Sequence, residues 1–164
     1  MYKENDYLIY KKEVCRVKEI IKNKINGLDY YILVPISDES LIIDVPTDNR
    51  MGYIRSIITK KEAENLINKI PIIEPLTNID DKYIEKTYKE LLYNGTNEDL
   101  IKIIKTTYLR NDNRIKNNKK ISDKDRIFFE KAEEYLYNEL SIALNISVAE
   151  TKKYILNKVE SLIK

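Results

Sequence analysis

The sequence predicts an α+β protein in which a small antiparallel β-sheet precedes a helical domain of about five helices. Three observations favour this class. Short segments rich in β-branched residues and tyrosine are confined to about the first 56 residues. Helix-start patterns recur only from Thr59 onward. Apolar residues such as Leu100, Ile103 and Ile104 then follow helical spacing. We therefore expect two domains, residues 1–57 and 58–164.

Four strands are expected in the first domain. The candidate segments are 7–10 (YLIY), 14–21 (VCRVKEII), 29–35 (DYYILVP) and 41–46 (LIIDVP). Turn-forming residues separate them, at Lys22–Gly27 and at 37–40. In the last segment Leu41 and Val45 point to one face and Asp44 to the other, which indicates a half-buried strand. Four short antiparallel strands in this space predict a small SH3- or Tudor-like β-barrel.

Five helices are expected in the second domain. A hydroxyl residue stands three positions before a carboxylate at Thr59/Glu62, Thr77/Asp80, Thr96/Asp99, Ser122/Asp125 and Ser147/Glu150. The hydroxyl can cap a free backbone N–H, and the carboxylate favours the positive end of the helix dipole. The predicted helices span 60–69, 79–93, 97–110, 123–144 and 148–163. The segment 71–78 holds two prolines and is expected to be a linker or a domain boundary.

Composition restricts the possible chemistry. The chain has no histidine, which removes the commonest general base and metal ligand. Its one cysteine, Cys15, lies in a predicted strand, where a buried thiol is usual. The three glycines are too scattered for a phosphate-binding loop. We expect the adjacent Asp80 and Asp81 to serve a helix start rather than a metal. No catalytic residue, metal, cofactor or small-molecule substrate is predicted.

The expected location is the cytoplasm, without a membrane partner. No apolar run approaches the ~20 residues that cross a bilayer, and the amino terminus is charged from Lys3. A single cysteine also fits a reducing compartment.

Positive charge gathers between residues 101 and 126, although the net charge of the chain is only +2. From 101 to 120 the single acid is Asp112. The centre of this cluster, NDNRIKNNKK (111–120), is expected to be a loop between two helices, where side chains could reach a phosphate backbone together. A solvated surface without a partner is the alternative interpretation.

The chain resembles the CarD/CdnL family of bacterial transcription regulators over nearly its whole length. The segments that carry the resemblance are NDYLIY (5–10), VCRV (14–17), DYYILVP (29–35), LIIDVPTDN (41–49), GYIRSIITKKEAENLI (52–67) and LLYNG (91–95). The most specific feature is the combination of YYIL, VPTDN and the downstream G-x-I-R-x-I. The resemblance implies a Tudor-like domain that binds the β subunit of RNA polymerase and a helical domain on promoter DNA.

By this resemblance the protein is a non-catalytic regulator that modulates the stability of promoter open complexes. The sheet would dock on polymerase by pairing a strand with a partner edge. The expected polymerase contacts are Lys22, Asn23, Ile42 and Asp44. Some family members carry arginines near positions 23 and 44, so the docking surface here differs in charge.

The same resemblance implies a wedge in the minor groove at the upstream edge of the melted DNA. The family's wedge is normally tryptophan, which this chain lacks. Ile79 stands at that place, and Tyr83, one turn later, is the alternative wedge. A buried hydrophobic staple at the helix start is the other interpretation of Ile79. The expected DNA contacts, to the minor groove and the phosphate backbone, are Ile79, Lys82, Tyr83, Lys86, Arg110, Arg114, Lys116, Lys119, Lys120, Lys124 and Arg126. The missing tryptophan and the acidic pair Asp80/Asp81 favour a second hypothesis, a polymerase- or protein-binding adaptor that has lost DNA wedging.

Overall fold

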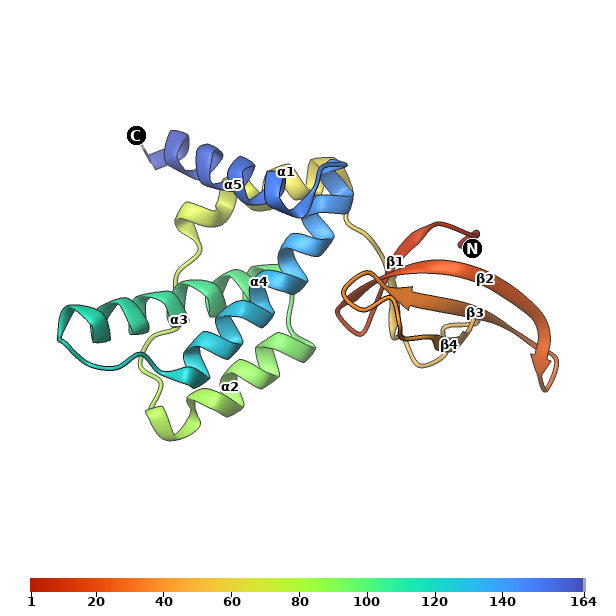
Figure 1. Cartoon of the computed structure of the whole chain (residues 1–164), viewed down its shortest axis with the longest axis horizontal. Helices are drawn as coiled ribbons and strands as arrows, with labels where there is room; N and C mark the ends of the chain where they lie inside the picture. Colours follow the sequence, from red (N-terminus) through yellow and green to blue (C-terminus); the bar gives the residue numbers. More distant parts are fainter. Residues whose placement is uncertain (164) are drawn as a thin grey trace. The chain divides into compact units, whose positions relative to one another are not determined.

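The computed structural model describes residues 1–163 and divides the chain into two compact units between Thr59 and Lys60 (Figure 1). The first, called here the sheet unit, contains all the strands, and the second, the helical unit, contains all the helices of the described residues. The α+β class predicted from the sequence is confirmed. No helix within the described residues is long and apolar enough to span a bilayer.

The sheet unit is one five-stranded antiparallel sheet. Its strands are β1 (Tyr7–Tyr10), β2 (Glu13–Ile25), β3 (Leu28–Pro35), β4 (Ile43–Pro46) and β5 (Ile54–Ser56), in the spatial order β4-β3-β2-β1-β5. The sheet does not close, so β4 and β5 form its two edges and the structure does not confirm the expected SH3- or Tudor-like barrel. β5 was not predicted from the sequence, because a strand of three residues is too short to show an alternating pattern.

Side chains at alternate positions of β2 and β3 form much of the core of the sheet unit. Leu8, Cys15, Val17 and Leu33 are fully buried, and Val45 joins the same cluster from β4. β2 continues to Ile25, four residues beyond the predicted strand. Bulges interrupt its pairing with β3 after Val17 and after Ile21. Figure 1 shows β2 and β3 as a long curved ribbon.

The helical unit contains five α-helices and one short 3₁₀ helix in the described residues. Their bounds are α1 (Lys60–Lys69), η1 (Ile70–Ile72), α2 (Asp81–Asn94), α3 (Asn97–Lys116), α4 (Asp123–Leu144) and α5 (Val148–Ile163). α3 packs against α4, and α5 packs against both α1 and α4. Buried residues such as Tyr88, Ile103 and Leu140 fill the space between the helices.

The helix caps predicted at Thr96, Ser122 and Ser147 are present. The hydroxyls of Thr96, Ser122 and Ser147 accept hydrogen bonds from the backbone N–H three residues later, at 3.3, 3.2 and 3.0 Å. At α2 the prediction was wrong. Asp80 itself is the cap, and its carboxylate accepts from the Lys82 N–H at 3.1 Å, so the helix begins at Asp81 rather than 79.

The predicted end of α3 was also wrong. The helix continues six residues beyond 110 to Lys116, so most of the segment expected to be a basic loop is helical. No proline or glycine interrupts residues 111–116.

The proline-containing segment 71–78 belongs inside the helical unit and does not separate the two units. The Leu76 N–H donates to the Thr106 hydroxyl at 2.8 Å, and Lys105 Nζ donates to the Ile73 carbonyl at 2.6 Å. Both partners lie on α3, so the segment is held against that helix.

Candidate functional site

The edge strand β4 has free backbone hydrogen-bonding groups. The Thr47 N–H donates to the Asp29 carbonyl at 2.9 Å, and the register places Asp44 opposite Ile32 and Pro46 opposite Tyr30. Bonded and non-bonded pairs alternate along an antiparallel ladder, so the backbone groups of Asp44 and Pro46 point away from β3. Proline has no N–H. Asp44 is therefore the residue of β4 that offers both a donor and an acceptor to an added strand.

The opposite edge, β5, is covered by one side chain. The Asn49 amide nitrogen donates to the Ile54 carbonyl at 2.9 Å, and its oxygen accepts from the Ile54 N–H at 3.0 Å. Asn49 has φ 51°, a left-handed conformation that asparagine adopts more readily than most residues. The Asn49 amide therefore occupies the positions that a neighbouring strand would take. The sheet unit presents β4, and not β5 at Ile54, for strand addition.

The predicted polymerase contacts lie near the end of β2 and on or beside β4, because β2 includes Lys22 and Asn23, which were expected in a turn. Asp29 accepts from the Asn23 N–H at 3.0 Å and from Lys22 Nζ at 3.1 Å. These two bonds, the Asn23 bond first, lower the pKa of the Asp29 carboxyl. Asp44 is paired with Lys24, a residue that the sequence did not single out.

Ile42 precedes β4 and is 59% exposed. The structure thus gathers Lys22 and Asn23 around Asp29, and Lys24 joins the same end of β2 to Asp44.

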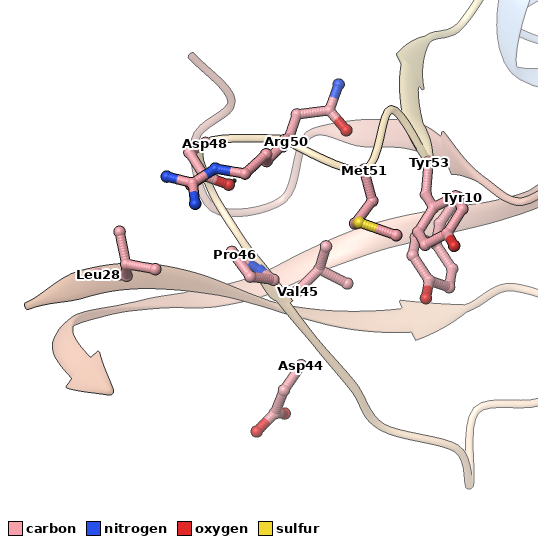
Figure 2. A pocket seen from close by; sticks show the side chains of 10 residues that line it. Tyr10, Leu28, Asp44, Val45, Pro46, Asp48, Arg50, Met51 and Tyr53 are labelled. Carbon is pink, nitrogen blue, oxygen red and sulfur yellow. Dashed lines mark hydrogen bonds and ion pairs between the residues drawn. The ribbon is translucent and has the colours of Figure 1, made fainter. Parts of the chain in front are cut away.

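A hollow of about 280 Å³ lies beside β4 (Figure 2). Val45 and Pro46 form one side, and the rings of Tyr10 and Tyr53 lie at the other end. Met51, from the loop that connects β4 to β5, also lines it. The two rings meet edge to face with centroids 6.0 Å apart. The hollow thus separates β4 from Tyr10 and Tyr53, so these parts of the open sheet do not pair.

The start of α2 holds the predicted wedge residues. Ile79 is half-buried and lines a hollow of about 180 Å³ together with Leu76, Ile84 and Leu109. Tyr83 is 53% exposed. Lys82 Nζ lies 5.3 Å from the centroid of its ring. Lys86 is also exposed on the same helix. Of the two wedge candidates, Tyr83 is the more accessible.

Two arginines of the predicted basic cluster bind a buried carboxylate. Asp125 is only 1% exposed and accepts from Arg110 Nε at 3.1 Å and Arg114 Nη1 at 2.6 Å. The Tyr88 hydroxyl donates to the same carboxylate at 2.9 Å. Burial, and then this bond, raise the pKa of Tyr88. Arg110 also reaches Asp81 at 3.0 Å. Both guanidinium groups therefore connect α3 to neighbouring helices.

Most other cations of the cluster have acidic partners as well. The pairs are Lys116–Asp112 at 2.8 Å, Lys124–Glu85 at 3.5 Å, Arg126–Glu130 at 3.3 Å and Arg126–Asp123 at 3.7 Å. Lys119 and Lys120 follow the end of α3 and form no ion pair with another described residue. The local excess of positive charge seen in the sequence is thus reduced by Asp112 within the segment 101–120 and by acids from outside it, such as Asp81 and Asp125.

Sequence reasoning missed the roles of Asn49 and Asp125. Asn49 follows Thr47-Asp48 in a turn-like stretch, but its partner Ile54 could not be identified from that pattern. Asp125 fits the Ser-x-x-Asp helix start, and its N–H is capped by Ser122. Its carboxylate instead meets side chains from two other helices.

The described residues contain little reactive chemistry. Cys15 is buried, and burial, followed by the nearby charge of Glu13, raises the pKa of its thiol to about 12. A thiol with that pKa is protonated at neutral pH and is a poor nucleophile. No group of potential metal ligands occurs among the described residues.

Neither a family model nor a curated protein matches this chain.

The Asn49 contact predicts a large effect of Asn49→Gly on stability. Glycine tolerates the left-handed backbone but leaves the Ile54 N–H and carbonyl without their partner. We expect a loss of about 1–3 kcal/mol in the free energy of unfolding of the sheet unit. Chemical denaturation followed by tyrosine fluorescence would measure it. An unchanged unfolding free energy would show that water replaces the amide at no cost.

The buried carboxylate predicts that Asp125→Asn destabilises the helical unit. The substitution leaves two guanidinium groups without their charge partner. Because both arginines remain about a quarter exposed, we expect about 2–3 kcal/mol rather than the full cost of breaking a buried ion pair. Asp123→Asn is the matched control, since that side chain is 84% exposed and should change stability by less than about 0.5 kcal/mol. Thermal unfolding followed by circular dichroism at 222 nm compares the two. Equal losses would contradict the assignment.

Proposed function

We propose that this protein is a non-catalytic transcription regulator of the CarD/CdnL type. In this proposal the sheet unit binds the β subunit of RNA polymerase, and the helical unit contacts promoter DNA near the upstream edge of the melted region. The consequence is a changed lifetime of the open complex. The proposal joins the resemblance of the sequence segments to the presence of a sheet unit and a helical unit in one chain.

The open edge of β4 is the observation that carries the proposal. Asp44 has an outward N–H and carbonyl, whereas the equivalent groups of Ile54 on β5 are occupied by Asn49. An exposed edge with unpaired groups is a template for an added strand. Ile42 and the hollow beside β4 supply apolar surface next to this edge. These features suit a docking role and require no catalytic group.

The DNA contact is proposed for the start of α2 rather than for the segment between α3 and α4. Tyr83, Lys82 and Lys86 are exposed there, and an aromatic ring beside lysines can stack on an unpaired base while the cations meet phosphates. Arg110 and Arg114 form ion pairs with Asp125 and are therefore less available to bind phosphate groups. Lys119 and Lys120 are the remaining candidates from the basic cluster.

The second candidate function is the adaptor that docks on polymerase or another protein without wedging DNA. The ion pairs of Arg110 and Arg114 favour it, because they remove two cations from a phosphate-binding surface. The half-buried position of Ile79 also favours it, since a wedge must enter the groove.

Docking is tested by Asp44→Pro. Proline is tolerated on edge strands but removes the outward N–H. We expect the loss of one backbone hydrogen bond to cost about 1–3 kcal/mol, which is about five- to 150-fold in affinity for purified RNA polymerase. Biolayer interferometry would measure the affinity.

Asp44→Ala is the matched control, because it loses the Lys24 ion pair but keeps the backbone N–H. We expect its affinity to stay within about twofold of the unmodified chain, since exposed ion pairs contribute little. Unchanged affinity of the proline variant would exclude β4 as the docking edge, and no binding of the unmodified chain would reject the proposal.

DNA wedging is tested by Tyr83→Ala in a promoter-complex decay experiment. Loss of one base-stacking contact, worth about 1–3 kcal/mol, should shorten the open-complex half-life by about five- to 150-fold. Tyr93 is equally exposed, at 53%, near the other end of α2, so Tyr93→Ala is the control. A half-life that responds equally to both variants would argue against a specific role for Tyr83.

Ile79→Trp separates the regulator from the adaptor. A longer open-complex half-life would indicate that position 79 faces DNA. An unchanged half-life, together with no effect of Tyr83→Ala and retained polymerase binding, would favour the adaptor.

A further inference from the structure

The chain around β4 has an unusual distribution of charge. Residues 25–49 contain no lysine or arginine. The acids in this range are Asp29, Asp38, Glu39, Asp44 and Asp48. Asp44 lies on β4 and Asp29 on the neighbouring strand β3, and the other three lie in the loops that precede and follow β4.

Three of these acids are compensated by basic residues from outside the range. Asp29 pairs with Lys22, Asp44 with Lys24, and Asp48 with Arg50. Asp38 and Glu39 are different, because neither has a basic partner among the described residues and both are exposed. They lie in the loop that leads into β4. The uncompensated charge is therefore located at the beginning of the edge strand.

Apolar surface lies immediately beyond these two acids. Leu41 is 52% exposed and Ile42 is 59% exposed. The hollow beside β4 continues this surface, with Met51, itself 71% exposed, over the space (Figure 2). Its volume of about 280 Å³ is sufficient for one large apolar side chain, since a cavity of about 150 Å³ holds benzene.

We propose that β4 receives an extended segment in which an apolar side chain is accompanied by a lysine or arginine about three to five residues away. The backbone of the segment pairs with Asp44, the apolar side chain enters the hollow, and the cation lies near Asp38 and Glu39. The spacing is shorter than the six residues between Glu39 and Val45, because a turn closed by the bond from the Leu41 N–H to the Asp38 carbonyl shortens the path that an extended partner must span. The inference rests on the proposed docking role of β4 and specifies the chemistry of the partner that the edge accepts.

The charge at this edge also disfavours other occupants. Asp38 and Glu39 would repel an acidic segment and a phosphate backbone alike. The same two carboxylates would raise the association rate of a basic segment at low ionic strength. The selectivity of the edge is therefore electrostatic at its beginning and apolar along β4.

A random dodecapeptide library displayed on phage tests the inference with the full chain as the immobilised target. We expect recovered peptides to contain an apolar residue and a lysine or arginine at the stated spacing. Their binding should weaken with added salt and should require the Asp44 N–H, so that Asp44→Pro reduces it at least tenfold.

Glu39→Lys gives the charge test, and Glu4→Lys is its matched control. Glu4 is an exposed acid on the amino-terminal segment of the same unit, without a basic partner among the described residues. Exchanging an attraction for a repulsion at an exposed site should weaken peptide binding about three- to tenfold with Glu39→Lys. A library selection on that variant should replace basic residues with acidic ones. Glu4→Lys should change neither result.

The outcomes separate this inference from the proposed function. Recovery of peptides without a basic preference, recovery of none that depends on Asp44, or the same preference with Glu39→Lys would each overturn the inference. If the peptide preference appears as expected but the chain does not bind RNA polymerase, the polymerase proposal fails and the selectivity of β4 stands.

Discussion

The incomplete closure of the sheet is the constraint from which the accessible surfaces of the sheet unit follow. A sheet that stops at five strands has two edges, and each edge carries backbone groups that need partners. The chain meets this need at β5 with a single amide, that of Asn49, which bonds both backbone groups of Ile54. At β4 it uses a proline, because Pro46 has no donor to satisfy. Within β4 as the structure describes it, Asp44 is therefore the residue whose N–H and carbonyl both point outward.

The loop that contains Asn49, whose amide bonds β5, also lines the hollow beside β4. Residues 47–53 connect the two edge strands. Their side chains Met51 and Tyr53 line the hollow but do not fill it. A hydrogen-bonding edge and an apolar recess consequently lie side by side. Strand addition draws affinity from the backbone and specificity from side-chain pockets, so this arrangement contains both elements of such a site.

A buried carboxylate has the corresponding role in the helical unit. Asp125 accepts from Tyr88 on α2 and from Arg110 and Arg114 on α3, so one side chain connects three helices. A buried charge requires such partners, because desolvation would otherwise oppose its ionised form. The structural use of these arginines means that the density of positive charge along a sequence overstates the charge available to a ligand. On α2, by contrast, Lys82 is exposed beside the ring of Tyr83, and Lys86 is exposed on the same helix.

Local signals in the sequence determined most of the secondary structure. The β-branched and tyrosine-rich run of 29–35, the hydroxyl caps at Thr96, Ser122 and Ser147, and the apolar spacing of α3 all act over a few residues, and the structure confirms them. Tertiary structure alone decided that the sheet remains open, that β5 exists, and that α3 continues to Lys116. It also decided which charged side chains face solvent. The physical reason is that Asn49, Asp125 and Lys24 each find partners that lie 5 to 37 residues away along the chain. A pattern of neighbouring residues cannot predict such partners, because only the folded chain brings them together.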